Sequence, residues 1–191
     1  EDRFLIFGSG FAEEFHLRWF WHADPPADVF VRSLASTLNG VSIAGPRSRE
    51  LVQRLTRIDL SPGAFKLFEV RETAVGFAPS ILSRAGFTGE LGYEIWTTPD
   101  YFATLYDDLM DAGSDLGLRL FGGRALSSLR LEKGYGSFQK DFRPDYTAAE
   151  TGLDRFVDFN KAEFTGRAAA LADGVAGVAA FLIHQPFGVI D

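Results

Sequence analysis

The sequence predicts a domain of the α+β class, and three observations support this. Short apolar runs typical of strands recur along the chain, amphipathic helical segments separate some of them, and the two kinds do not alternate strictly. The 191 residues are 46% hydrophobic, which suffices for a sizeable core. Since strict alternation favours a parallel sheet, its absence favours mainly antiparallel strands packed with helices.

The first part of the chain is expected to form a β-α-β-β-α unit. A tight turn is expected at Asn39-Gly40, because this pair favours hairpin connections. A helix is expected after Gly45-Pro46, because proline at the first helical position sacrifices no hydrogen bond. The elements expected here are strands at Phe4–Phe7, Val29–Leu34 and Val41–Ala44, and helices at Phe11–His22 and from Pro46 through Leu55.

A second round of strands and helices is expected to follow. Thr98 and Pro99 mark the start of a helix as N-cap and first residue, Gly113 closes it, and Gly134 suits the left-handed end of a later helix. The expected elements are strands at Lys66–Thr73, Phe77–Arg84 and Tyr93–Thr97, a helix with apolar residues Phe102, Leu105, Tyr106, Leu109 and Met110 on one face, and a helix at Gly123–Lys133 that buries Leu126, Leu129 and Leu131.

These elements predict two ferredoxin-like β-α-β-β-α halves of mainly antiparallel sheet. We expect them at about residues 1–62 and 63–173 of one domain. Because the chain starts at Glu1 and contains a single methionine, Met110, we expect it to begin inside a longer protein.

The chain after Tyr135 reads as irregular. A helical turn is expected near Ala148–Leu153 and a helix at Phe164–Ala172. An apolar strand is expected at Val175–Ile183, so residues 174–191 are predicted to begin a further β-rich module, a C-terminal β-barrel that is truncated here.

The composition excludes several classes of function. A chain without cysteine has no disulfide, thiolate metal site or cysteine nucleophile, and its three histidines lack metal-ligand spacing, so no metal is expected. The net charge of −7 disfavours nucleic acid and anionic lipid as partners. The sequence has no apolar run long enough to span a membrane and no signal segment, so we expect a cytoplasmic protein.

One glycine-punctuated segment, R-A-G-F-T-G-E-L-G-Y-E at residues 84–94, points to a binding site. Glycines at every third position allow positive φ and close approach of a flat ligand, while the following strand argues against a dinucleotide-phosphate loop. Glu94 stands in an apolar run, where a carboxylate is costly unless it accepts hydrogen bonds. An aminopyrimidine edge would supply them; a plain glycine-rich hairpin is the alternative interpretation.

A second segment, R-A-L-S-S-L-R-L-E-K-G-Y-G at residues 124–136, places arginines on a helix. Arg124 lies in its first turn after two glycines, where a guanidinium can pair bidentately with a ligand carboxylate. The alternative for Arg119, Arg124 and Arg130 is a solvated helix face.

Five motifs in order resemble a known family. They are V-S-I-A-G-P-R-S-R-E-L, G-F-T-G-E-L-G-Y-E-I, S-L-R-L-E-K-G-Y-G, E-T-G-L-D-R-F-V and F-T-G-R. This pattern is similar to the folate-binding domain of the glycine-cleavage aminomethyltransferases, shared by dimethylglycine and sarcosine dehydrogenases, and the aromatic stretch around Trp19 favours the dehydrogenase branch. The resemblance covers nearly the whole chain.

The resemblance implies tetrahydrofolate as cofactor and transfer of an aminomethyl or iminium unit to it. It implies that Glu94 receives the pterin ring, that Phe87 and Tyr93 shape the pocket, and that Arg124 contacts the folate tail. Phe87 departs from the tyrosine usual in the family, so that hydroxyl is missing. The family's aspartate near the reactive nitrogens falls before Glu1, so the catalytic residues of this chain are unknown.

The implied partners are a small amine-derived one-carbon donor and either a lipoyl carrier protein or a fused flavin oxidoreductase module. The pocket is expected in the concave region between the two halves. Two alternatives stay open, and a third is disfavoured. The chain could be an inactive binding or scaffold module, or a folate-dependent demethylase; an RNA-modifying branch is disfavoured because its cysteine is missing from Lys133-Gly134-Tyr135.

Overall fold

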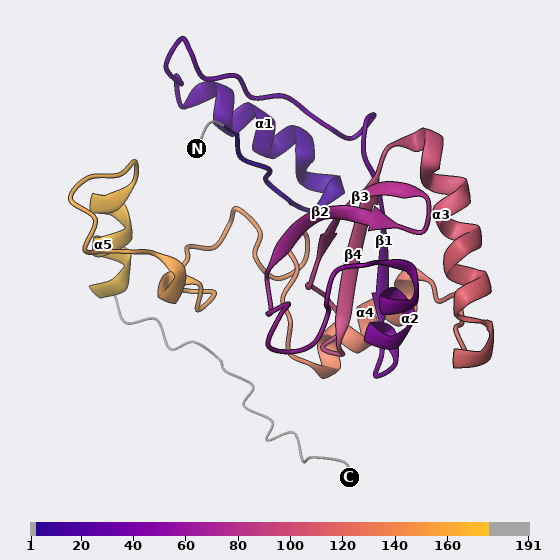
Figure 1. Ribbon diagram of the computed structural model, residues 1–191. Helices are drawn as coiled ribbons and strands as arrows, with labels where there is room; N and C mark the ends of the chain where they lie inside the picture. Colours follow the sequence, from indigo (N-terminus) through magenta and orange to yellow (C-terminus); the bar gives the residue numbers. More distant parts are fainter. Residues whose placement is uncertain (1–2, 176–191) are drawn as a thin grey trace. The chain divides into compact units, whose positions relative to one another are not determined.

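The computed structural model describes residues 3–175, and the chain divides into two compact units at residues 1–135 and 136–191. The first unit combines helices with one antiparallel sheet (Figure 1), which confirms the predicted α+β mixture. Its four strands are β1 (Asn39–Ala44), β2 (Val70–Val75), β3 (Ala78–Ser83) and β4 (Gly92–Thr97), and they lie in the order β1-β4-β3-β2.

The register of the sheet assigns each strand residue to one of two faces. Every neighbouring pair is antiparallel, with Ile43 opposite Tyr93, and Leu82 opposite Ile95. Since side chains alternate along a strand, these four share one face, and Glu94 and Trp96 lie on the other.

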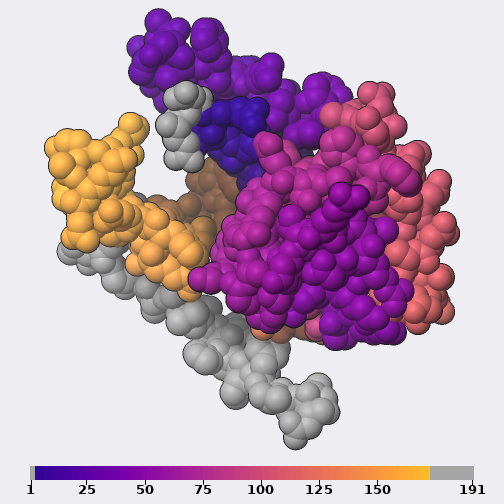
Figure 2. Space-filling view, in the orientation of Figure 1, coloured from indigo at the N-terminus to yellow at the C-terminus, as the bar shows by residue number. Residues whose placement is uncertain are grey.

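The face that carries Tyr93 forms the core. Helices α2 (Ser48–Leu55) and α3 (Pro99–Ala112) pack on it, as the apolar residues spaced three and four positions apart in both helices predict. In Figure 2 the residues of α2, the strands and α3 form adjoining violet, magenta and pink surfaces. The core consists of Ile43, Leu51, Val52, Leu60, Phe65, Val75, Ala78, Leu82, Tyr93, Ile95, Leu105 and Leu109.

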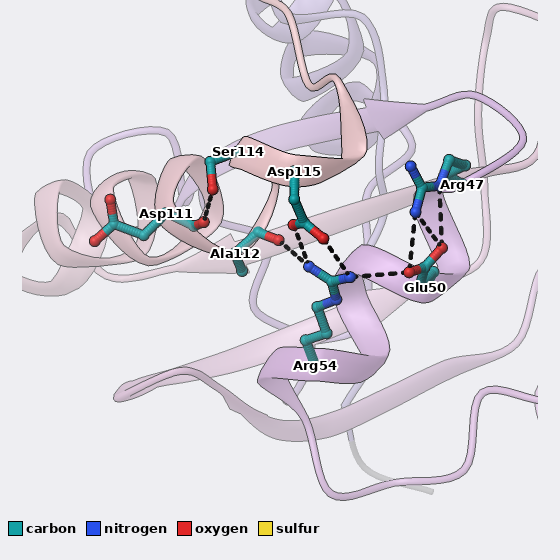
Figure 3. A network of polar contacts seen from close by, with 7 residues as sticks. All are labelled: Arg47, Glu50, Arg54, Asp111, Ala112, Ser114 and Asp115. Atoms are coloured by element: carbon teal, nitrogen blue, oxygen red, sulfur yellow. Dashed lines mark hydrogen bonds and ion pairs between the residues drawn. The ribbon is translucent and has the colours of Figure 1, made fainter.

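A polar network ties the end of α2 to the end of α3 (Figure 3). The Arg54 guanidinium donates to the Ala112 carbonyl oxygen at 2.8 Å, to Asp115 at 2.5 and 3.0 Å, and to Glu50 at 2.9 Å. The hydrogen bonds from Arg54 to Asp115 lower the pKa of the Asp115 carboxyl. The guanidinium thus satisfies a carbonyl left without a partner at the helix end while linking two helices that cover the same sheet face.

The prediction of a hairpin turn at Asn39-Gly40 is wrong, because both residues belong to β1, which pairs with the distant β4. Gly40 faces Trp96 across the ladder, and a Cβ at this position would lie 2.5 Å from the indole ring. The glycine therefore serves close packing of an aromatic ring rather than a turn.

Two expected strands do not form. Residues 3–9 and 29–34 have no strand structure, and Phe4, Ile6 and Phe30 stay exposed. Arg3 pairs with Glu72 on β2 at 3.1 Å, and the Phe7 ring lies 5.2 Å from that of Trp96 on β4. Since Glu72 and Trp96 belong to the same cross-strand row, residues 3–7 cross the open sheet face instead of adding a strand at its edge.

The helices near residues 11–22 and 123–133 are confirmed as α1 (Glu13–His22), preceded by η1 (Gly10–Ala12), and α4 (Gly123–Glu132). Gly134 has φ +76°, as expected for a left-handed helix end. The buried side of α4 differs from expectation: Leu131 is exposed, whereas Arg130 is buried and donates from Nη1 to the Tyr135 carbonyl oxygen at 2.7 Å.

The remaining elements are η2 (Ser114–Leu116), η3 (Asp154–Phe156) and α5 (Arg167–Val175), the last two in the second unit. The helical turn expected near 148–153 is present as hydrogen-bonded turns, including Leu153 N to the Ala148 carbonyl oxygen at 2.8 Å. The strand expected at Val175–Ile183 lies outside the described residues except for Val175, which ends α5. The pairing of β1 with β4 joins strands from both sides of the expected boundary near residue 62 into one sheet.

Within residues 3–175, none of the helices has the length and apolar character needed to cross a membrane.

Replacing Gly40 by alanine tests the packing of Trp96. The added methyl would overlap the indole ring, so we expect the free energy of unfolding to fall by about 1–3 kcal/mol in urea titrations. Gly63→Ala is the control, because a Cβ there meets no atom within 4 Å, and it should change stability by less than about 0.5 kcal/mol. Equal stability of the two variants would contradict this account of the strand.

Candidate functional site

The candidate site is centred on Glu94, on the sheet face opposite the core. In the ladder Glu94 pairs with Ser42 of β1 on one side and Ser83 of β3 on the other. Both neighbours are small, so they leave room beside the carboxylate that larger cross-strand residues would fill. The site is therefore built on the two central strands of the sheet and their neighbour β1.

The carboxylate of Glu94 is half-buried and lacks a strong partner. Among residues 3–175 it forms no ion pair, and no donor makes a hydrogen bond of ordinary geometry to it. Burial raises the pKa of Glu94, and the nearby Trp96 indole N–H opposes this shift. The Trp96 N–H therefore makes at most a poorly aligned hydrogen bond to the carboxylate, since Nε1 is buried and has no partner at ordinary distance and angle.

A desolvated acceptor without a donor is uncommon in a folded protein. Burying a polar group without compensation costs free energy, so such groups normally find partners within the chain. Glu94 and the Trp96 N–H thus place a half-buried acceptor and a buried donor close together on one face of the sheet.

The glycine-rich turn before β4 makes close contacts with neighbouring backbone and with Lys133. A Cβ on Gly92 would lie 2.9 Å from the Ala85 carbonyl oxygen and 3.2 Å from the Gly86 Cα. Gly89 has φ +83°, and a Cβ there would lie 2.5 Å from the Lys133 side chain. These glycines therefore bring the turn against β4 and against the end of α4.

Phe87 projects from this turn and stacks on Tyr135, with ring centroids 6.3 Å apart and an interplanar angle of 26°. Both rings remain partly open to solvent, at 37% and 40% exposure. The contact places an aromatic pair beside the start of β4, two residues before Glu94.

Tyr93 lies on the other face of the sheet. It is fully buried, stacks on Phe65 at 6.2 Å and accepts a hydrogen bond from Arg49 Nε at 3.2 Å through its hydroxyl. Its ring cannot contact a ligand held by Glu94, because neighbouring residues of a strand point to opposite faces. Any influence of Tyr93 on the site passes through the position of β4.

Arg124 is exposed in the first turn of α4 and makes no hydrogen bond or ion pair within residues 3–175. Lys133, nine positions further along the chain, contacts the glycine-rich turn. The helix rise therefore places Arg124 about 14 Å along α4 from that contact. The structure thus brings Phe87 close to the start of β4 and leaves Arg124 apart from that turn. Within the same residues no group of three or more side chains could hold a metal ion.

Sequence reasoning missed Trp96 and Tyr135 as members of the site. The alternation of β4 was a usable signal for Trp96, since residues two apart share a face. Tyr135 had no such signal, because its ring meets Phe87 only through the folded position of α4.

Residues 1–161 match the family described as the GCVT N-terminal domain. The chain belongs to this family. The match covers most of the described residues, including the sheet, the glycine-rich turn and α4.

Curated relatives include dimethylglycine dehydrogenases and aminomethyltransferases. Dimethylglycine dehydrogenase of Rattus norvegicus, a mitochondrial protein, is 38% identical over 168 residues, covering 86% of this chain and 20% of the relative. An aminomethyltransferase of Halothermothrix orenii is 37% identical over 131 residues, covering 69% of this chain and 36% of the relative. The chain thus spans about a fifth of the first relative and about a third of the second.

Among solved structures, a heterotetrameric sarcosine oxidase from Corynebacterium sp. U-96 is similar, with a TM-score of 0.43 and 20% identity, over 49% of this chain and 46% of that chain.

Replacing Glu94 by glutamine tests its desolvation. Because the folded pKa is raised, ionisation of Glu94 opposes folding above that pKa, and the penalty disappears below the ordinary pKa of glutamate. We expect Glu94→Gln to unfold at higher urea concentration than wild type at pH 7, with the difference shrinking on acidification. Glu90→Gln, an exposed position of the same turn, is the control. A stabilisation by Glu94→Gln that is equally large at about pH 3 would contradict the effect.

Proposed function

We propose that this chain is the tetrahydrofolate-binding part of an enzyme that transfers a one-carbon unit, carried as an aminomethyl or iminium group, to the reduced folate. Membership of the GCVT N-terminal domain family supports this, as do relatives named aminomethyltransferase and dimethylglycine dehydrogenase. The observation that carries the proposal is the half-buried Glu94 carboxylate, which accepts no hydrogen bond of ordinary geometry within residues 3–175.

The pterin ring of tetrahydrofolate offers the hydrogen-bond donors that the Glu94 carboxylate needs. Its pyrimidine edge carries a ring N–H beside an amino group, so it offers two parallel donors to one carboxylate. Binding of this edge would compensate the desolvation of Glu94 and favour its ionised form, because hydrogen bonds to a carboxylate stabilise the charge.

Two further residues support a ligand of this shape. Phe87, stacked on Tyr135 near the start of β4, offers an aromatic surface for the flat ring system. Arg124 is an exposed cation without a partner in residues 3–175, set apart from the turn along α4, and we propose that it binds the acidic tail. Tyr93 contributes indirectly, by fixing β4 through the core.

The chemistry proposed for these residues is positioning. A protein that holds reduced folate against a one-carbon donor accelerates transfer by orientation and by stabilising developing positive charge. A general acid or base for the step is not assigned to any residue of this chain. The partners we propose are a small amine-derived donor and either a lipoyl carrier protein or a fused flavin oxidoreductase module.

The dehydrogenase-type setting is our first choice, because the Rattus norvegicus relative of that name is 38% identical over 168 residues, whereas an aminomethyltransferase of Thermoanaerobacter pseudethanolicus is 28% identical over 178 residues. An inactive folate-binding or scaffold module is the second candidate, which the departure at Phe87 from the family's tyrosine favours. In fold terms, we propose that residues 1–173 form one folate-binding domain. The cytoplasmic location remains a prediction.

Titration of the chain with tetrahydrofolate tests the role of Glu94. We expect Glu94→Ala to weaken binding at least about 10-fold, or ~1.4 kcal/mol, because the donors of the pterin edge lose their acceptor. Glu90→Ala, exposed in the same turn, should bind like wild type. Calorimetry is the measurement, and absence of binding by all three proteins would refute the proposed function.

The tail contact is tested with two ligands. We expect Arg124→Ala to weaken binding of tetrahydrofolate by about 3- to 10-fold, since a charge-assisted pair is lost, and to leave binding of a tetrahydropterin without the acidic tail unchanged. Arg119→Ala, which removes an exposed arginine before the same helix, is the control. Equal weakening for both ligands would show that Arg124 acts on the fold rather than on the tail.

A further inference from the structure

The second unpartnered group of the site is the indole N–H of Trp96. Buried side-chain nitrogens usually have partners, and among the described residues only Arg84 Nε and Trp96 Nε1 lack one. Arg84 has a structural task, because its Nη1 donates to the Phe65 carbonyl oxygen at 2.9 Å within the core side. Trp96 Nε1 has no comparable contact.

The position of the Trp96 ring is fixed from two sides. Gly40 lies opposite it in the ladder, close enough that a Cβ would meet the ring at 2.5 Å, and the Phe7 ring lies 5.2 Å away at 44°. The indole therefore has little freedom to turn its N–H toward another acceptor. The donor is held beside the carboxylate of Glu94, on the same face of β4.

We propose that Trp96 is a specificity-determining residue that donates its indole N–H to the carbonyl oxygen of the pterin ring. This inference rests on the proposed function, because it assigns a second contact to the same ligand. The pyrimidine edge of a pterin presents an amino group, a ring N–H and a carbonyl oxygen in sequence. Glu94 accepts from the two donors, and Trp96 donates to the neighbouring acceptor, so the pair matches the whole edge.

The pairing would give the buried Trp96 N–H, whose contact with Glu94 is poorly aligned, an acceptor of its own. A site built to hydrogen-bond a ligand group rejects analogues that lack it, since its own buried group is then left unpaired. The N–H is buried, so a ligand reaches it only when covering side chains shift. Phe7 is one side chain against the ring, and it belongs to residues 3–9, which form no strand, so its displacement breaks no ladder hydrogen bonds.

The test compares tetrahydrofolate with its 4-thioxo counterpart. The sulfur analogue keeps the ring N–H and the amino group that face Glu94 but replaces the carbonyl oxygen by a weaker acceptor. Calorimetric titration of wild type should give affinity for tetrahydrofolate about 10-fold above that for the thioxo compound. In Trp96→Phe the preference should fall to within about threefold, chiefly because tetrahydrofolate binds less tightly.

Trp19→Phe is the matched control, because Trp19 is 60% exposed on α1, and it should keep the wild-type preference. Glu94→Gln separates this inference from the proposed function: it should weaken both ligands. If wild type binds neither compound, the proposed function fails. If wild type binds both compounds equally, or if Trp96→Phe retains the full preference for tetrahydrofolate, Trp96 does not donate to the carbonyl oxygen. If Trp96→Phe does not fold, equal affinity of wild type for the two compounds still overturns the inference.

Discussion

The structure depends on the alternation of side chains along β4. Tyr93, Ile95 and Thr97 point into the core that α2 and α3 cover, and all three are almost completely buried. Glu94 and Trp96 must then point to the opposite face, whatever their polarity. Because hydrophobic burial of one set fixes the strand, the protein can hold a carboxylate and an indole N–H at fixed positions where neither has a satisfying partner. The free energy of core packing offsets the cost of leaving them unpaired.

The open face is covered in part by chain that is not part of the sheet. Residues 3–7 contact Glu72 through Arg3 and Trp96 through Phe7, so they lie over the row beside Glu94. This arrangement makes the environment of Glu94 less polar than that of a residue on a bare sheet, which agrees with a carboxyl pKa raised by burial. A ligand here would meet one wall made by strands and another made by irregular chain. Strands supply fixed groups, and the irregular segment can adjust without loss of ladder hydrogen bonds.

The glycines of the turn before β4 have two structural roles, close backbone approach and a positive φ. Gly86 and Gly92 allow two stretches of backbone to approach each other, and Gly89 takes a positive φ while the Lys133 side chain lies over it. Their spacing indicates a flat ligand only indirectly. What the turn achieves directly is to join β4 with the end of α4, and so to bring Phe87 against Tyr135.

The sequence alone determined the α+β class, the helices from Pro99 and Gly123, and the family, because these depend on local periodicity, capping residues and motif spacing. It failed at Asn39-Gly40 and at Phe4–Phe7, where local signals for a turn and a strand were overridden by contacts with Trp96. Only the tertiary structure decided that β1 pairs with β4, that Arg130 is buried, and that Tyr135 meets Phe87. Those outcomes depend on which strands pair and which face the helices cover, and such long-range choices leave no trace in the neighbouring residues.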